Sequence, residues 1–255
     1  MGLDAELALL KAVPVARDLN GREYKLPIEG QHWLVAARTG GGKGSIIWSL
    51  VLGLEPAWRV GLVKFWGCDP KRLELAICPN CWEHYADNEA DIVSMLEQCV
   101  QEMFERAGQL KGKARKFTPS TETPLNVVVV DEMGYLSAML PDRKLRERAE
   151  KAVSTILALG RAVGYSLVGA VQDPRKETVG FRDLFPIRIA GGLPEPMVDL
   201  VLGEGMHDAG ALCEQIPLGN AGAGVAYVIN ETTLKPVCVR SAWCSDLAIQ
   251  RALRI

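Results

Sequence analysis

Apolar runs alternate with amphipathic stretches along this chain of 255 residues. Continuous apolar runs predict buried strands, whereas apolar residues at three- and four-residue spacing predict helices. Strands are expected at residues 33–37, 60–66, 127–130, 165–171, 186–190, 224–229 and 236–239. Helices are expected at residues 45–54, 87–110 and 143–164, and a short helix is expected from residue 245.

This alternation of strands and helices predicts an α/β fold with a mostly parallel central sheet flanked by helices. The strands lack an alternating polar pattern, which is typical of a parallel sheet buried on both faces. Residues 1–30 are expected to be a lead-in containing a hairpin, because extended runs at 13–15 and 24–28 flank the turn Asp18-Leu19-Asn20-Gly21. Residues 31–255 are expected to form one domain.

Composition narrows the class of protein. Hydrophobic residues make up 48% and charged residues 24% of the chain, as in an ordinary folded protein. The sequence has no apolar run of the ~18 residues that a membrane helix needs and no secretory signal pattern. Its seven cysteines therefore suggest free thiols in a cytoplasmic protein. A net charge of −2 does not mark a nucleic-acid-binding protein, so DNA binding would require local charge or assembly.

A glycine-rich loop follows the first expected core strand and precedes a helix. Residues 37–43, ARTGGGK, fit the pattern [AG]xxxxGK of a phosphate-binding P-loop. Glycines allow backbone N–H groups to surround an anion, and the helix N-terminus adds a positive partial charge. Lys43 would contact the β- and γ-phosphates. The candidate nucleotide-binding residues are Arg38, Thr39, Gly40, Gly41, Gly42, Lys43, Gly44 and Ser45.

One position departs from the P-loop pattern. The hydroxyl residue that usually follows the lysine and binds Mg²⁺ is replaced by Gly44, and Ser45 comes next. One residue along a helix is about 100° of rotation, so Ser45 need not face the metal. Either the backbone shifts and Ser45 binds Mg²⁺, or the metal relies on water and on Asp131.

A pair of acids follows the third core strand. Asp131 and Glu132 come directly after the run VVVV, as in a Walker-B motif. The carboxyl end of a strand is where open α/β sheets bind ligands. We expect Asp131 to serve Mg²⁺ and Glu132 to orient or deprotonate the attacking water. A second acid favours hydrolysis over transfer to another molecule.

Together these motifs resemble the FtsK/SpoIIIE (FtsK/HerA) family of DNA translocases. The similarity is greatest to short actinobacterial plasmid-transfer (TraB/TraSA-like) or phage forms that carry Gly-Lys-Gly-Ser. It extends over residues 13–244, although Ala37 stands where the family usually has Gly. The residues that carry it are HWLVA at 32–36, TGGGKGSIIW at 39–48, DPK at 69–71, LGRAVGY at 159–165, QDPR at 172–175 and FRDLFPIRI at 181–189.

The resemblance implies a RecA-like P-loop ATPase motor that forms hexameric rings around double-stranded DNA and uses ATP and Mg²⁺. By position, Gln172 would sense the γ-phosphate, and either Arg161 or Arg188 would act on a neighbouring subunit's nucleotide. No transmembrane or winged-helix domain is expected, so a bare motor core would depend on a membrane, relaxosome or phage partner protein. The alternatives are a protein-secretion ATPase of the same superfamily and an ATP-gated assembly module with little hydrolysis.

Two weaker signals leave their alternatives open. Cys78, Cys81 and His84 either form part of a structural zinc site or include a reactive or incidental CxxC pair. The basic residues between 111 and 116 either contact DNA phosphates or form a solvated helix end. These basic residues are Lys111, Lys113, Arg115 and Lys116.

Overall fold

The computed structural model describes residues 3–174, 181–217, 219–232 and 235–254. Within these ranges one ten-stranded sheet runs through the molecule in the order β2-β1-β10-β9-β8-β3-β7-β6-β4-β5. The strands are β1 Val13–Asp18, β2 Glu23–Leu26, β3 Trp33–Ala36, β4 Val63–Cys68, β5 Trp82–Ala86, β6 Leu125–Asp131, β7 Tyr165–Val171, β8 Ile187–Ala190, β9 Val225–Ile229 and β10 Val237–Arg240.

The sheet has a parallel part and an antiparallel part. Strands β8, β3, β7, β6, β4 and β5 are parallel to one another. Strands β9, β10, β1 and β2 extend the sheet by antiparallel pairing beyond β8. Every residue of β3, β6 and β7 is buried, as their unbroken apolar runs predict. The expected α/β class with a mostly parallel core is confirmed.

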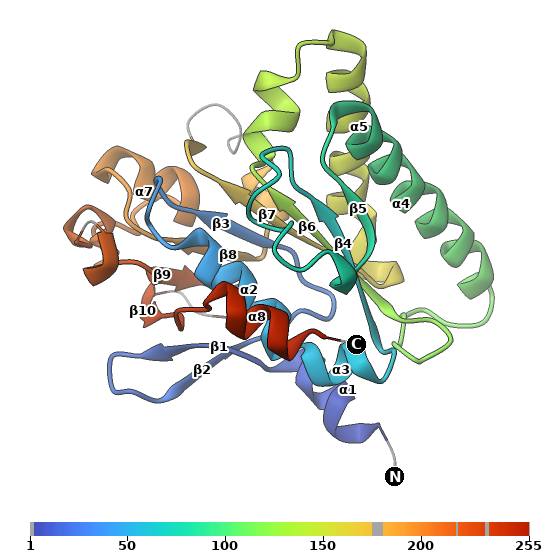
Figure 1. The fold of residues 1–255 in the computed structure, drawn as a ribbon, viewed down its shortest axis with the longest axis horizontal. Helices are drawn as coiled ribbons and strands as arrows, with labels where there is room; N and C mark the ends of the chain where they lie inside the picture. Colours follow the sequence, from blue (N-terminus) through green and yellow to red (C-terminus); the bar gives the residue numbers. More distant parts are fainter. Residues whose placement is uncertain (1–2, 175–180, 218, 233–234, 255) are drawn as a thin grey trace.

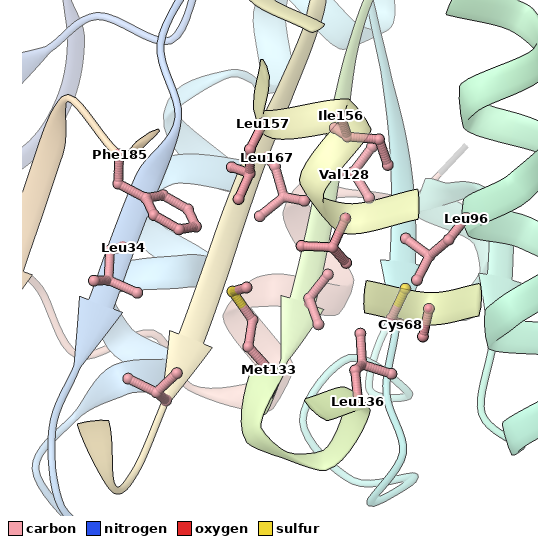
Figure 2. Close-up of a cluster of buried hydrophobic side chains, with 14 of the residues drawn as sticks. Leu34, Cys68, Leu96, Val128, Met133, Leu136, Ile156, Leu157, Leu167 and Phe185 are labelled. Carbon is pink, nitrogen blue, oxygen red and sulfur yellow. The ribbon is translucent and has the colours of Figure 1, made fainter. Parts of the chain in front are cut away.

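Helices cover both faces of the sheet (Figure 1). One face carries α1 Asp4–Lys11, α2 Lys43–Gly53, α3 Glu55–Arg59 and α8 Asp246–Ala252. The other face carries α4 Glu89–Leu110, α5 Arg143–Leu159 and α7 Glu195–Leu202. In Figure 2 the strand residues Leu34, Leu167 and Val128 belong to the same apolar cluster as Ile156 from α5 and Leu96 from α4. The two apolar cores therefore hold the strands β3, β7 and β6 rigidly side by side.

Several expected elements are confirmed, and others differ at their ends. The hairpin of β1 and β2 forms, and β1 also pairs with β10. Strand β4 begins at Val63 rather than at residue 60, because a turn with Gly61 at φ +80° precedes it. Helix α5 ends at Leu159 and continues only as a 3₁₀ turn to Val163, before Gly164 at φ +77°. Arg175 of the QDPR motif lies outside the described residues.

Candidate nucleotide-binding site

The glycine-rich loop joins β3 to α2 at the carboxyl edge of the sheet. Gly40 and Gly42 have φ of +75° and +84°, a conformation that suits glycine. Gly42 also packs closely on Gly224, since a Cβ there would lie 2.8 Å from the Gly224 Cα. The loop is therefore held both by its own conformation and by the turn before β9.

Ala37 fits without crowding the loop. Its side chain is fully buried, and its backbone N–H donates to the Val171 oxygen at 3.2 Å. A Cβ on Gly41 would lie 3.0 Å from the Ala37 methyl, and one on Gly191 would lie 2.8 Å from it. The two neighbouring glycines thus provide the space that this methyl group occupies.

Lys43 and the acid pair converge at this edge, as the sequence predicts. The Lys43 Nζ lies 3.5 Å from the Glu132 Oε2, and both residues are almost fully buried. Lys71, from the loop after β4, reaches the same oxygen at 2.7 Å. The Lys43 Nζ has no hydrogen-bond partner among the described residues. A buried ammonium that makes no hydrogen bond is costly, so this atom is poised to receive an anionic ligand.

Glu132 adopts an unusual backbone conformation, with φ at +85°. A residue other than glycine costs free energy in this region and needs support from its surroundings. The next residue, Met133, is buried in the core drawn in Figure 2 and packs over Gly169, where a Cβ would lie 2.9 Å from its Cγ. The Glu132 Oε1 also accepts a hydrogen bond from the Gln172 backbone N–H at 3.2 Å. Core packing and this bond fix the carboxylate.

Gln172 connects the acid pair to the phosphate loop. It follows β7, the strand between β3 and β6, so its backbone lies between the two motifs. The Thr39 hydroxyl donates to the Gln172 Oε1 at 3.3 Å, while the Gln172 N–H binds Glu132. Gln172 is therefore bonded both to the acid pair and to the phosphate loop.

The ionised form of the buried Asp131 side chain is disfavoured by its surroundings. Its side chain is 5% exposed, and burial raises its pKa despite the opposing charges of Lys43 and Lys71. The ionised form is therefore less favourable in the folded than in the unfolded chain, and this penalty fades as pH falls through the raised pKa.

We expect Asp131→Asn to raise the free energy of unfolding of the nucleotide-free protein by about 1 kcal/mol at pH 7, or roughly 2–4 °C in melting temperature. The gain should shrink as the pH is lowered from 7 toward 4, because the raised pKa of Asp131 makes it take up a proton more readily in the folded than in the unfolded chain. Thermal melts at both pH values test this, with the exposed Asp208→Asn as the matched control. Equal or lower stability of Asp131→Asn at pH 7 would show that the lysines outweigh the burial of the carboxylate.

A pocket of about 510 Å³ opens at these residues. Its lining includes the phosphate loop from Arg38 to Ser45, together with Asp131 and Gln172. The loop after β4 supplies Lys71 and Glu74, and the segment leading into α8 supplies the 79% exposed Trp243. All the expected loop residues thus line a single pocket together with Asp131 and Gln172.

Positions 44 and 45 face different surroundings, as the helical rotation predicts. Gly44 faces the Glu74 carboxylate, whose carbon would lie 2.7 Å from a Cβ at position 44. The Ser45 Cβ lies on the other side, 3.7 Å from where a Cβ of Gly224 would be. Ser45 lines the pocket, but its side chain begins near the turn before β9 rather than beside Glu74.

Sequence reasoning missed the contributions of Asp69 and Glu74 and assigned no role to Lys71. Asp69 is fully buried and accepts hydrogen bonds from the backbone N–H groups of Leu75 and Ala76 at 2.9 and 3.3 Å. These bonds fold the loop so that Glu74 and Lys71 point to the pocket. The available signal was the position of DPK directly after a core strand, next in the sheet to the strand that carries the acid pair.

The two candidate arginines lie away from this pocket. The Arg161 Nε donates to the Gly30 oxygen at 2.7 Å, and its guanidinium pairs with Glu231 at 3.2 Å. Arg188 lies on β8 with its Nη1 3.5 Å from where a Cβ of Gly203 would be, and its Nε is buried without a partner among the described residues. Neither arginine lines the pocket of its own chain.

The cysteine–histidine group and the basic cluster 111–116 both lie outside the pocket. Cys78 and Cys81 are buried, and the His84 ring stacks on Trp66 with centroids 4.0 Å apart. Within the described ranges no three His, Cys, Asp or Glu side chains are arranged to hold a metal ion by themselves. All seven cysteines are described, and each is a free thiol. The basic cluster 111–116 is exposed after α4, where the chain leads to the amino end of β6.

The chain has the mixed α/β fold of P-loop proteins, with a glycine-rich loop and an acid pair at one edge of the sheet. A family model described as the FtsK/SpoIIIE family matches residues 8–118, which include the phosphate loop and the DPK motif. This part of the chain is therefore similar to the FtsK/SpoIIIE family, and the resemblance expected from the sequence is confirmed. Among the described residues, no helix is both long enough and apolar enough to span a bilayer.

Curated relatives are longer than this chain. The Ftsk domain-containing protein YdcQ of Bacillus subtilis is 28% identical over 204 residues, covering 76% of this chain and 40% of YdcQ. The DNA translocase FtsK of Streptococcus agalactiae is 27% identical over 209 residues, covering 73% of this chain and 25% of that protein. The chain thus spans well under half the length of either relative.

Solved structures share the fold. The pCW3 conjugation coupling protein TcpA superposes with a TM-score of 0.77 and 19% identity, over 96% of this chain and 70% of TcpA. The cytoplasmic domain of the type VII secretion ATPase EccC of Thermomonospora curvata gives 0.72 and 21%, over 96% of this chain and 31% of EccC. At these identities the similarity shows the fold alone.

Proposed function

We propose that this chain is an ATP-driven double-stranded DNA translocase that acts in DNA transfer or in plasmid or phage DNA handling. The observation that carries the proposal is the convergence of Asp131 and Glu132 with the buried Lys43 ammonium, which makes no hydrogen bond among the described residues, beside the pocket that Lys43 and Asp131 line. The relationship to FtsK proteins, one of which is named a DNA translocase, supports the choice of substrate.

The pocket fits a magnesium nucleotide. The Lys43 ammonium and the loop N–H groups would bind the phosphate oxygens, and Asp131 would orient the water shell of Mg²⁺. Mg²⁺ would neutralise charge on the phosphates. Because the described acids do not form a metal cage, phosphate oxygens and water would have to complete its coordination.

Glu132 is the residue we propose to position the attacking water. Its carboxylate pairs with Lys71 at 2.7 Å and neighbours Lys43 at 3.5 Å. Phosphate oxygens compete for both lysines, which would leave the carboxylate to accept a hydrogen bond from water. The bond from the Gln172 N–H then keeps Glu132 in place and connects it to Thr39.

A ring assembly would complete the site. Charge that develops on the γ-phosphoryl oxygens during hydrolysis requires a further cation. Since neither Arg161 nor Arg188 lines its own pocket, we propose that one of them acts on the nucleotide of a neighbouring copy. The exposed indole of Trp243 offers a flat surface on which the nucleobase can stack at the pocket mouth.

Linear duplex DNA is expected to stimulate steady-state ATP hydrolysis several-fold, and the stimulation should fall between 50 and 200 mM salt as phosphate contacts weaken. The test measures phosphate release with and without DNA at both salt concentrations. Hydrolysis that duplex DNA leaves unchanged at 50 mM salt would favour a protein-secretion motor. Tight ATP binding without turnover, with or without DNA, would favour an ATP-gated assembly module.

A further inference from the structure

The missing hydroxyl of the P-loop leaves space that another side chain fills. A Cβ at Gly44 would lie 2.7 Å from the Glu74 Cδ and 2.9 Å from its Oε2. Glu74 comes from the loop after β4, thirty positions along the chain. The carboxylate therefore occupies the space into which a serine or threonine at position 44 would project.

Neighbouring side chains hold Glu74 in this orientation. The Trp48 indole N–H, from the second turn of α2, donates to the Glu74 Oε1 at 3.1 Å. Trp48 is itself 3% exposed and packs against Trp82, with ring centroids 6.0 Å apart. Asp69 caps the N–H groups of the next two residues, Leu75 and Ala76. Among the described residues the Glu74 Oε2 makes no hydrogen bond, so it can bind a ligand.

The charges around Glu74 favour a cation when phosphate is present. Glu74 and Asp131 line the same pocket. Burial and Asp131 both raise the pKa of Glu74 above its ordinary value, and Lys43 opposes them. The independent sign of a ligand is the Lys43 Nζ, which is buried, without a hydrogen-bond partner and directed to this pocket.

We propose that Glu74 supplies the protein oxygen ligand of the nucleotide-bound Mg²⁺, directly or through one water, in place of the P-loop hydroxyl that Gly44 lacks. This inference rests on the proposed nucleotide site. Carboxylate oxygens are preferred Mg²⁺ ligands, and few protein ligands are needed when phosphates and water complete the octahedron. Gly44 and Glu74 then form one functional unit, in which the small residue makes room for the acid.

The test compares the affinity for the non-hydrolysable analogue AMPPNP, measured by calorimetry, in excess Mg²⁺ and in EDTA. Wild-type protein should bind roughly tenfold or more tightly with Mg²⁺, and Glu74→Gln should lose most of this difference. The amide oxygen of the new side chain still accepts from Trp48, so the melting temperature without nucleotide should stay close to that of the wild type. Glu83→Gln, an exposed partner of Lys64, is the matched control.

A second variant tests whether a P-loop hydroxyl can replace the Glu74 carboxylate as the Mg²⁺ ligand. Gly44→Ser combined with Glu74→Ala restores a hydroxyl at the usual position, because φ at Gly44 is not in the left-handed region and the shortened side chain at position 74 vacates the space. We expect this double variant to regain Mg²⁺ dependence. Binding of Mn²⁺, followed by its electron paramagnetic resonance signal in the presence of AMPPNP, should show the same order of variants.

The outcomes separate the two proposals. If the wild-type chain fails to bind AMPPNP at all, the proposed nucleotide site is wrong and the role of Glu74 is wrong with it. If the wild type binds with Mg²⁺ dependence and Glu74→Gln keeps that dependence, the nucleotide site stands and Glu74 is not a metal ligand. Trp48→Phe provides a second variant, since loss of the bond that orients Glu74 should weaken Mn²⁺ binding in part.

Discussion

Replacement of Lys43 by alanine should abolish nucleotide binding, with a loss of affinity of about 100-fold or more. The ammonium is the one buried cation at the loop without a hydrogen-bond partner among the described residues. Contacts between this charge and two phosphates are charge-assisted and desolvated, so each contributes more than an ordinary hydrogen bond. Calorimetric titration of the variant with AMPPNP and Mg²⁺ measures the loss.

The stability of the Lys43→Ala protein distinguishes a loss of nucleotide binding from misfolding. Burial lowers the pKa of Lys43, which means that the folded chain disfavours the ionised side chain. Removal of this side chain should therefore not unfold the protein. Lys64→Ala removes an exposed lysine paired with Glu83 and should bind AMPPNP as the wild type does. Near-normal affinity in a folded Lys43→Ala protein would mean that the glycine-rich loop does not bind the triphosphate.

Glu132→Gln should leave nucleotide binding within about threefold of the wild type while lowering turnover by about 10²–10⁴-fold. The amide has the shape of the carboxylate, and its oxygen still accepts from the Gln172 N–H, so the backbone at φ +85° keeps its support. An amide, however, cannot accept a proton from water. Single-turnover hydrolysis of ATP and AMPPNP affinity, measured on the same preparation, give both quantities.

A surface acid provides the comparison for this variant. Glu97→Gln removes a partner of Arg148 between α4 and α5, far from the pocket, and should hydrolyse ATP normally. If Glu132→Gln also turned over at the wild-type rate, another group would have to position the water. Asp131 would then be the first candidate, because it lines the pocket directly.

Much of this site could be predicted because its parts are local in sequence. The glycine-rich loop and the apolar strand before Asp131 each carry their own pattern, and parallel strands bring their carboxyl ends to one edge. The rotation of Ser45 away from position 44 followed from helix geometry alone. The convergence of Lys43 with the acid pair at 3.5 Å is therefore a consequence of topology that the motifs already implied.

Strand β5 and three short helices could not be predicted, because their local sequence patterns are weak. Strand β5 is WEHYA, in which polar residues interrupt the apolar pattern, and it forms because Trp82 and Ala86 are buried beside β4. The short helices α1, α3 and α7 lie in stretches to which the sequence assigned no element. Each is stabilised by packing on the two cores, which depends on residues distant in the chain.

By itself the sequence determined the α/β class, the order of the central elements along the chain and the positions of the glycine-rich loop and the acid pair, because residue type and spacing suffice for each. Only the tertiary structure decided that Lys71 and Lys43 neutralise Glu132, that Met133 over Gly169 supports its backbone, and that Glu74 fills the space beside Gly44. Each of these contacts joins segments separated by tens of residues. Their geometry depends on how the strands pair and how the loops pack, which no local pattern encodes.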